Sequence, residues 1–126
     1  NRFFIHKNVT ENKKNNFLKN SDLFCFTSNT RAESFGISLL EAINYSLPVI
    51  VSDNKGSGMQ DMVVEGYNGY NFKNNSPEDL KNKILKATKN QKRLSILSKN
   101  SKKLFKKRFD NKKIKNKIFE IYNSTS

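Results

Sequence analysis

Three short, largely apolar runs recur along the first half of the chain, with helix-like segments between them. They are at residues 2–5 (RFFI), 22–27 (DLFCFT) and 47–51 (LPVIV). An unbroken apolar run, in contrast to an alternating one, is typical of a strand that is buried on both faces. Because strands that alternate with helices are joined by right-handed crossovers, this pattern predicts a parallel sheet.

The segments around these runs complete the pattern. A fourth short strand is predicted at 69–72 (GYNF), directly after a turn-rich segment. Helices are predicted over 10–21, where Thr10 can cap the first turn, and from about residue 36 to residue 46. The predicted fold class is therefore α/β, a Rossmann-like, doubly wound parallel sheet with flanking helices.

After residue 75 the sequence predicts helices alone. Ser76 supplies a capping hydroxyl and Pro77 suits the first helical position. Two helices with apolar stripes follow, and Asp110 can cap a third. Their stripes are Leu80, Ile84 and Ala87; Leu94, Leu97, Leu104 and Phe105; and Ile114, Ile118, Ile121 and Tyr122. We therefore divide the chain into a partial Rossmann-like domain, 1–109, and a C-terminal helix and tail, 110–126.

The net charge of +13 over 126 residues raises the question of a polyanionic partner. Lysine supplies most of this charge, whereas arginine, which binds phosphate in a bidentate geometry, is scarce. Aromatic residues do not alternate with the basic ones, as a base-stacking surface would require. We therefore expect no specific nucleic-acid binding. The lysine-rich helices are interpreted as solvated faces, with contact to anionic lipid headgroups as the alternative.

Cys25 is the only cysteine, which excludes an internal disulfide and a cysteine-based metal cluster. We interpret it as a small apolar strand residue in a reducing compartment. The apolar runs are too short to cross a bilayer, and no signal-peptide pattern is present. We expect a cytoplasmic location, with the cytoplasmic face of the membrane as the alternative. Because the chain opens on Asn1 and starts almost at once with a strand-like run, we expect it to be a piece of a longer protein.

Two loops follow the predicted strands at their carboxyl ends, where open parallel sheets bind ligands. They are 28–36 (SNTRAESFG) and 52–61 (SDNKGSGMQD). A helix that begins near Gly36 points its backbone N–H groups at this crevice and makes an anion site without a basic side chain. Gly36 also removes a side chain where a phosphate would approach closely. The second loop contains Gly56 and Gly58, but their order relative to lysine is not that of a Walker loop.

Two glutamates flank this helix start. Glu33 lies just before it, and Glu41 follows eight positions after Glu33. Carboxylates on either side of an anion site would suit a ligand with a sugar, a diphosphate and a ribose in line. Periodicity leaves a second interpretation open, in which Glu33 only favours the helix dipole. In that interpretation Glu41, on the same helical face as Ser38 and Asn44, is simply solvated.

Four motifs in order resemble the C-terminal domain of family 4 nucleotide-sugar glycosyltransferases, which have the GT-B fold. The motifs are ESFGISLLEA (33–42), SLPVIVSD (46–53), SGMQDMV (57–63) and EGYNGYNF (65–72), and the similarity runs from about residue 3 to residue 75. The resemblance implies retaining transfer of a sugar from a nucleoside-diphosphate carrier. It also implies a reaction that needs neither a metal nor another cofactor.

The resemblance further implies a role for individual residues. Glu33 matches the motif glutamate that contacts hydroxyls of the transferred sugar near the reacting carbon, and it is the implied catalytic residue. The backbone amides of Phe35, Gly36 and Ile37 would hold the diphosphate, electrostatic help that is usually large in catalysis. Glu41 would bind the ribose hydroxyls. The full set of implied substrate-binding residues is Ser34, Phe35, Gly36, Ile37, Glu41 and Gly58.

The chain also departs from the family pattern. Ser46 replaces the glycine usual before Leu47, Asp61 stands where glutamate is usual, and IHKNV (5–9) lacks the usual glycine turn. The first strand–helix units of the domain and the N-terminal acceptor domain are absent from the chain, so we expect no catalysis by it alone. Its basic tail and expected cytoplasmic location suggest a glycan or lipid-linked acceptor for the parent enzyme.

Two alternatives come from other classes of protein. A non-catalytic basic module that binds anionic membrane or nucleic acid would lose affinity steeply with added salt, and changes at Glu33 or Glu41 would not affect it. A dehydrogenase-like nucleotide-binding domain would carry a G-x-G-x-x-G turn, which this sequence lacks.

Overall fold

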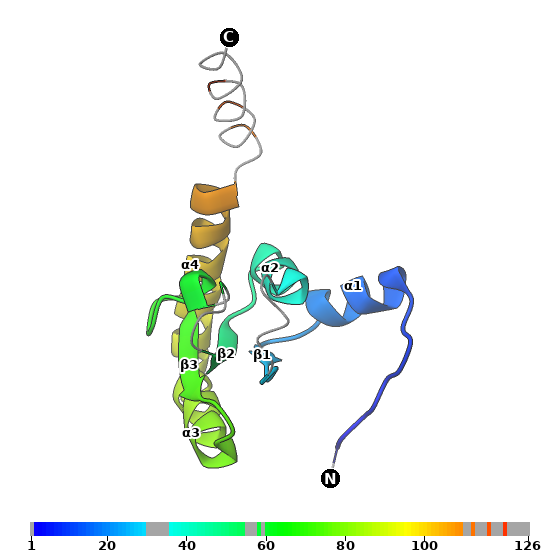
Figure 1. Cartoon of the computed structure of the whole chain (residues 1–126), viewed down its shortest axis with the longest axis vertical. Coiled ribbons are helices and arrows are strands. Elements are labelled where there is room, and N and C mark those ends of the chain that lie inside the picture. Colours follow the sequence, from blue (N-terminus) through cyan, green and yellow to red (C-terminus); the bar gives the residue numbers. More distant parts are fainter. Residues whose placement is uncertain are drawn as a thin grey trace.

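The computed structural model describes residues 2–29, 36–54, 58, 60–109, 112, 116 and 120. Within these residues helical segments and strands alternate as far as β3, and two helices follow it (Figure 1). They are α1 (Glu11–Lys19), β1 (Phe24–Phe26), α2 (Ile37–Asn44), β2 (Val49–Asp53), the 3₁₀ turn η1 (Gln60–Met62), β3 (Gly69–Lys73), α3 (Pro77–Ala87) and α4 (Gln91–Phe109).

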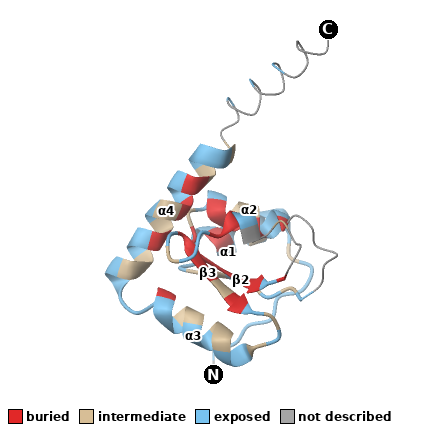
Figure 2. Ribbon diagram, turned by 60° about the vertical axis from the view of Figure 1, so that its left-hand side comes forward, coloured by how far each residue is buried: buried red, intermediate tan, exposed pale blue. Residues whose placement is uncertain are grey.

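The three strands form one parallel sheet in the order β1-β2-β3. Cys25 of β1 lies opposite Ile50 of β2, which in turn lies opposite Tyr70 of β3. Helices cover both faces of this sheet, so the predicted α/β fold with flanking helices is confirmed (Figure 2).

The central strand β2 is buried on both faces. Val49 and Val51 join the apolar cluster that includes residues of α1 and α2, whereas Ile50 joins the opposite cluster with Tyr70 and Ala87. All three β2 side chains named here have an exposed fraction of 0%. The unbroken apolar run predicted this two-sided burial correctly.

The helix starts predicted at Thr10 and Ser76 are also confirmed. Thr10 caps α1 by accepting a hydrogen bond from the backbone N–H of Lys13, at 3.3 Å. Ser76 caps α3 in the same way, accepting from the N–H of Asp79 at 3.3 Å. Both contacts satisfy a backbone donor that the first helical turn leaves without a partner.

The prediction of a strand at residues 2–5 was wrong. The segment has no regular structure, and Phe3, Phe4 and Ile5 are 90%, 80% and 85% exposed. Within the described residues no strand lies beside this segment, and an extended apolar run is stable only when its backbone groups are paired and one face is covered. Two-sided burial was also wrong for β1: Cys25 is exposed, and β1 pairs with β2 along one edge.

The helix α4 (Gln91–Phe109) confirms the second of the helices predicted after residue 75. Asp110 and the apolar stripe of the predicted third helix lie outside the described residues. Among the helices that the structure describes, none combines the length and the apolar character that a bilayer crossing requires.

Candidate functional site

The first turn of α2 is the centre of the candidate site. Because α2 connects the parallel strands β1 and β2, its amino end lies toward the carboxyl ends of the strands. Gly36 is the N-cap residue and is buried, and its carbonyl accepts hydrogen bonds from the N–H groups of Leu39 at 2.8 Å and Leu40 at 3.1 Å.

This amino end is suited to an anion. In the described part of α2, no side chain caps the helix start and no acidic residue occupies the first turn. Ile37, the first helical residue, is 71% exposed. The positive end of the helix dipole is therefore not offset by a carboxylate in this turn, and backbone N–H groups at such a position bind phosphates.

The structure describes only some of the predicted site residues. Glu33, Ser34 and Phe35 lie outside the described residues. One helix carries three of the others, as the sequence predicted: Gly36 is the N-cap of α2, and Ile37 and Glu41 lie within the helix. Gly58 is half-buried in a turn after β2.

Glu41 is held by a lysine that the sequence did not single out. The Nζ atom of Lys14 in α1 lies 2.8 Å from Glu41 Oε1 and 2.9 Å from Glu11 Oε1. The side chain of Glu41 is 28% exposed, so the interpretation of a simply solvated glutamate was wrong. Hydrogen bonds to Glu41 and, second, to Glu11 raise the pKa of the Lys14 ammonium above its ordinary value.

The Glu11–Lys14 spacing is recognisable in the sequence as a helical i,i+3 pair. The Lys14–Glu41 contact joins two helices across 27 positions. No local pattern predicts such a contact, because it depends on how α1 packs beside α2.

A polar cleft of about 770 Å³ lies at the carboxyl ends of β2 and β3. It is lined mainly by amide and carboxylate side chains, from Asn29, Asp53, Asn54, Asn71, Phe72, Lys73, Asn74 and Asp79. Among the described residues, Asn71 Oδ1 is a buried atom without a hydrogen-bond partner. The sequence placed Asn29, Asp53 and Asn54 in the two loops expected to border a ligand crevice, but it did not single out the residues that β3 and α3 contribute. Asparagine is so frequent in the chain that its positions carry little signal.

Two side chains of β2 and the residue after it, Ser52 and Asn54, fix the segment that leaves β1. The buried Asn54 donates through Nδ2 to the Ser28 carbonyl at 2.8 Å and accepts from Asn74 Nδ2 at 2.7 Å. The hydroxyl of Ser52 donates to the same Ser28 carbonyl. These bonds position the point from which the chain continues toward Glu33.

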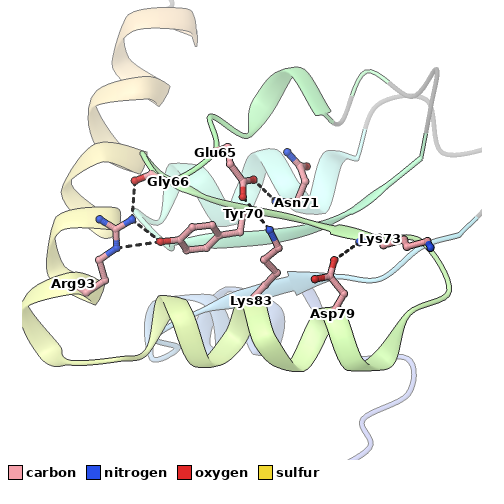
Figure 3. Close-up of polar contacts among 8 residues, drawn as sticks. All are labelled: Glu65, Gly66, Tyr70, Asn71, Lys73, Asp79, Lys83 and Arg93. Carbon is pink, nitrogen blue, oxygen red and sulfur yellow. Dashed lines mark hydrogen bonds and ion pairs between the residues drawn. The ribbon is translucent and has the colours of Figure 1, made fainter.

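The EGYNG motif (65–69) has a structural role. Gly66 has φ +74°, a left-handed conformation that favours glycine, and its carbonyl accepts from Arg93 Nη2 at 2.9 Å (Figure 3). Arg93 Nε also donates to the hydroxyl of Tyr70 at 3.1 Å. Glu65 accepts from the N–H of Asn71 at 2.8 Å, and its other carboxylate oxygen pairs with Lys83 at 3.1 Å. The motif therefore fastens β3 to α3 and α4.

Comparison with known proteins identifies the family. The model of the family described as glycosyl transferases group 1 matches residues 1–104. The chain belongs to this family. Two of its glycosyltransferase relatives come from Methanocaldococcus jannaschii, both uncharacterized: MJ1178, 34% identical over 97 residues, and MJ1069, 34% identical over 106 residues. This group 1 chain covers 27% and 26% of their lengths, and the alignments include 77% and 82% of the chain.

Solved structures support the same assignment. The structure of Anabaena Alr3699/HepE in complex with UDP superimposes with a TM-score of 0.77 at 25% identity, over 86% of the group 1 chain and 29% of HepE. The complex of the same protein with UDP-glucose gives a TM-score of 0.74. The C-terminal domain of the Francisella tularensis group 1 protein LpcC shares the fold, with a TM-score of 0.72 at 22% identity over 84% of the chain and 52% of that domain. The chain is thus a C-terminal domain portion of a GT-B glycosyltransferase.

Proposed function

We propose that the chain is the donor-binding part of a retaining glycosyltransferase that moves a sugar from a nucleoside-diphosphate carrier to a glycan or lipid-linked acceptor. The observation that carries this proposal is the amino end of α2. It begins at a buried glycine and lies toward the carboxyl ends of the strands in a group 1 glycosyltransferase. From Gly36 to Asn44, the part of this segment that the structure describes, it has neither a side-chain cap nor a first-turn acid.

In this proposal the backbone amides around Gly36 and Ile37 hold the donor's diphosphate. As the sugar leaves, negative charge grows on that diphosphate, and fixed N–H donors stabilise it without reorganising. Glu41 binds the ribose hydroxyls, and Glu33 binds hydroxyls of the transferred sugar near the reacting carbon. The transfer is proposed to need no metal.

The nucleotide is supported by the structural neighbours. The structures of HepE contain UDP or UDP-glucose, and HepE is 25% identical to the chain. We therefore propose a UDP-sugar as the first donor to test, with GDP- and ADP-sugars beside it. Because the chain covers 27% or less of its two curated relatives, transfer is assigned to the complete gene product and not to the chain alone. We place that enzyme in the cytoplasm, at the face of the membrane if its acceptor is a lipid.

A donor screen on the complete gene product tests the proposal. Glu33→Ala is expected to reduce transfer strongly, and Glu41→Ala is expected mainly to raise the KM for the donor. Glu78→Ala, at a glutamate whose side chain is 76% exposed on α3, is the matched control and should change neither constant.

Failure of every donor would overturn the proposal. If salt-sensitive binding to a polyanion persisted in the same protein, and Glu33→Ala and Glu41→Ala left it unchanged, the basic-module alternative would replace it.

A further inference from the structure

We propose that Lys14 is a positioning residue of the donor site, which orients the carboxylate of Glu41 for the ribose hydroxyls of the nucleotide. The inference rests on the proposed function, because the ribose role of Glu41 belongs to that function. It extends the donor site to α1, an element that none of the implied site residues occupies.

The contact has the geometry of an orienting bond. Lys14 Nζ lies 2.8 Å from Glu41 Oε1, and the two side chains are 33% and 28% exposed. A charge-assisted hydrogen bond of this length restricts the rotation of a carboxylate more than solvent does. Since a carboxylate has about four lone-pair positions on its two oxygens, a bond to one oxygen leaves acceptors for a diol.

Lys14 is itself held in place from two directions. Glu11 Oε1 lies 2.9 Å from the same ammonium, so two carboxylates share one cation. Leu18, one helical turn further along α1, is buried in the apolar cluster that contains Leu39 and Ile43 of α2. The helix that carries Lys14 is therefore anchored to the helix that carries Glu41.

Stability alone is a weak reason for this pair. Ion pairs near the surface contribute little to folding stability in general, because solvent screens the charges and two long side chains must be ordered. The chain offers an internal comparison in Lys83 and Glu65, which are 3.1 Å apart with side chains 23% and 50% exposed. That pair joins α3 to the turn before β3, and no proposed ligand contact involves it.

The test measures ribose preference in the complete gene product. Affinities for UDP, GDP and ADP and for their 2′-deoxy forms are measured by calorimetry for the wild type, Lys14→Met, Lys14→Arg, Glu41→Gln and the control Lys83→Met. The wild type should prefer the ribonucleotide. Lys14→Met should weaken its binding about three- to five-fold, because the freed Glu41 side chain must then be ordered when the ribose binds, with little change for the 2′-deoxy form. Lys14→Arg should restore the preference, and Lys83→Met should leave it unchanged.

The outcomes separate the two proposals. If Glu41→Gln abolishes the ribose preference while Lys14→Met leaves it intact, Lys14 has only a structural role and this inference is overturned alone. An unchanged preference in Glu41→Gln would overturn the ribose role of Glu41 as well. Absence of nucleotide binding by the folded wild type would overturn the donor-site proposal together with the inference. If Lys14→Met does not fold, Lys14→Arg is compared with the wild type instead. A retained ribose preference in Lys14→Arg supports the inference, and a lost preference contradicts it.

Discussion

Gly69 lies where the first residue of β3 meets the backbone of β2. A Cβ atom built at this position would lie 1.8 Å from the carbonyl oxygen of Val49, far inside the contact distance of two atoms. Gly69 of the x-G-x-N-G motif is therefore explained by strand spacing, whereas Gly66 is explained by its φ of +74°.

Substitution of these two glycines should separate the two causes. Gly69→Ala must push β3 away from β2 and is expected to lower the free energy of unfolding by roughly 3 kcal/mol or more, as overpacking does. Gly66→Ala has space for its methyl group and should cost only about 1–2 kcal/mol for the left-handed backbone. Urea denaturation measures both, and equal losses would contradict this explanation.

Cys25 gives a second prediction at the residue scale. The residue is exposed on β1, yet desolvation raises the pKa of its thiol above the ordinary value. Because the thiolate is the reactive form, we expect alkylation at pH 7 to be slower in the native chain than in urea. An alkylation rate in the native chain that equals or exceeds the rate in urea would contradict this prediction.

At the scale of elements, α4 is fastened to two turns by polar side chains. The buried Ser101 donates to the Leu47 carbonyl at 2.8 Å, and Ser98 donates to the Ser46 carbonyl at 2.7 Å. Asn100 donates to the Tyr67 carbonyl at 2.8 Å. These bonds hold α4 against the turn that precedes β2 and the turn that precedes β3.

Removal of the buried bond should loosen this attachment. Ser101→Ala leaves the Leu47 carbonyl without its donor and is expected to cost about 1–3 kcal/mol, the usual penalty for a buried unsatisfied group. Thermal unfolding measures the loss. The control is Ser95→Ala at an exposed position of the same helix, and a similar change in both variants would contradict the assignment.

The attachment of α1 to α2 should depend on pH at alkaline values. The pKa of Lys14 is raised above its ordinary 10.5, so its contribution to stability is complete below that value and is lost as pH rises through the higher native pKa. The stability difference between the wild type and Lys14→Met should therefore shrink above about pH 10.5, as followed by circular dichroism. A difference that stays constant to pH 12 would contradict this role.

The elements that were predicted correctly are those whose formation depends on residues close together in the sequence. β2 is an unbroken apolar run that is buried wherever it lies in the sheet, and the capping residues Thr10 and Ser76 act within one helical turn. The strand predicted at 2–5 failed because a strand needs a neighbour, and apolar character alone does not supply one. The Lys14–Glu41 pair escaped prediction because it depends on helix packing.

At the scale of the whole molecule, the sequence motifs divide into two kinds. The EGYNG segment is explained by contacts within the fold, through Arg93, Lys83 and the close approach to Val49. The start of α2 is not explained in that way, since in its described part neither a side-chain cap nor a first-turn acid occupies it. This difference separates residues that build the domain from those proposed to bind the donor.

In the proposed donor complex, the diphosphate lies against the amino end of α2. A crystal structure of the complete gene product with a bound UDP-sugar tests it most directly. We expect diphosphate oxygens about 3 Å from backbone nitrogens of residues 35–37, with the ribose hydroxyls at Glu41 and the sugar at Glu33. A diphosphate bound elsewhere, or a side chain of the enzyme filling the space before Gly36, would contradict it.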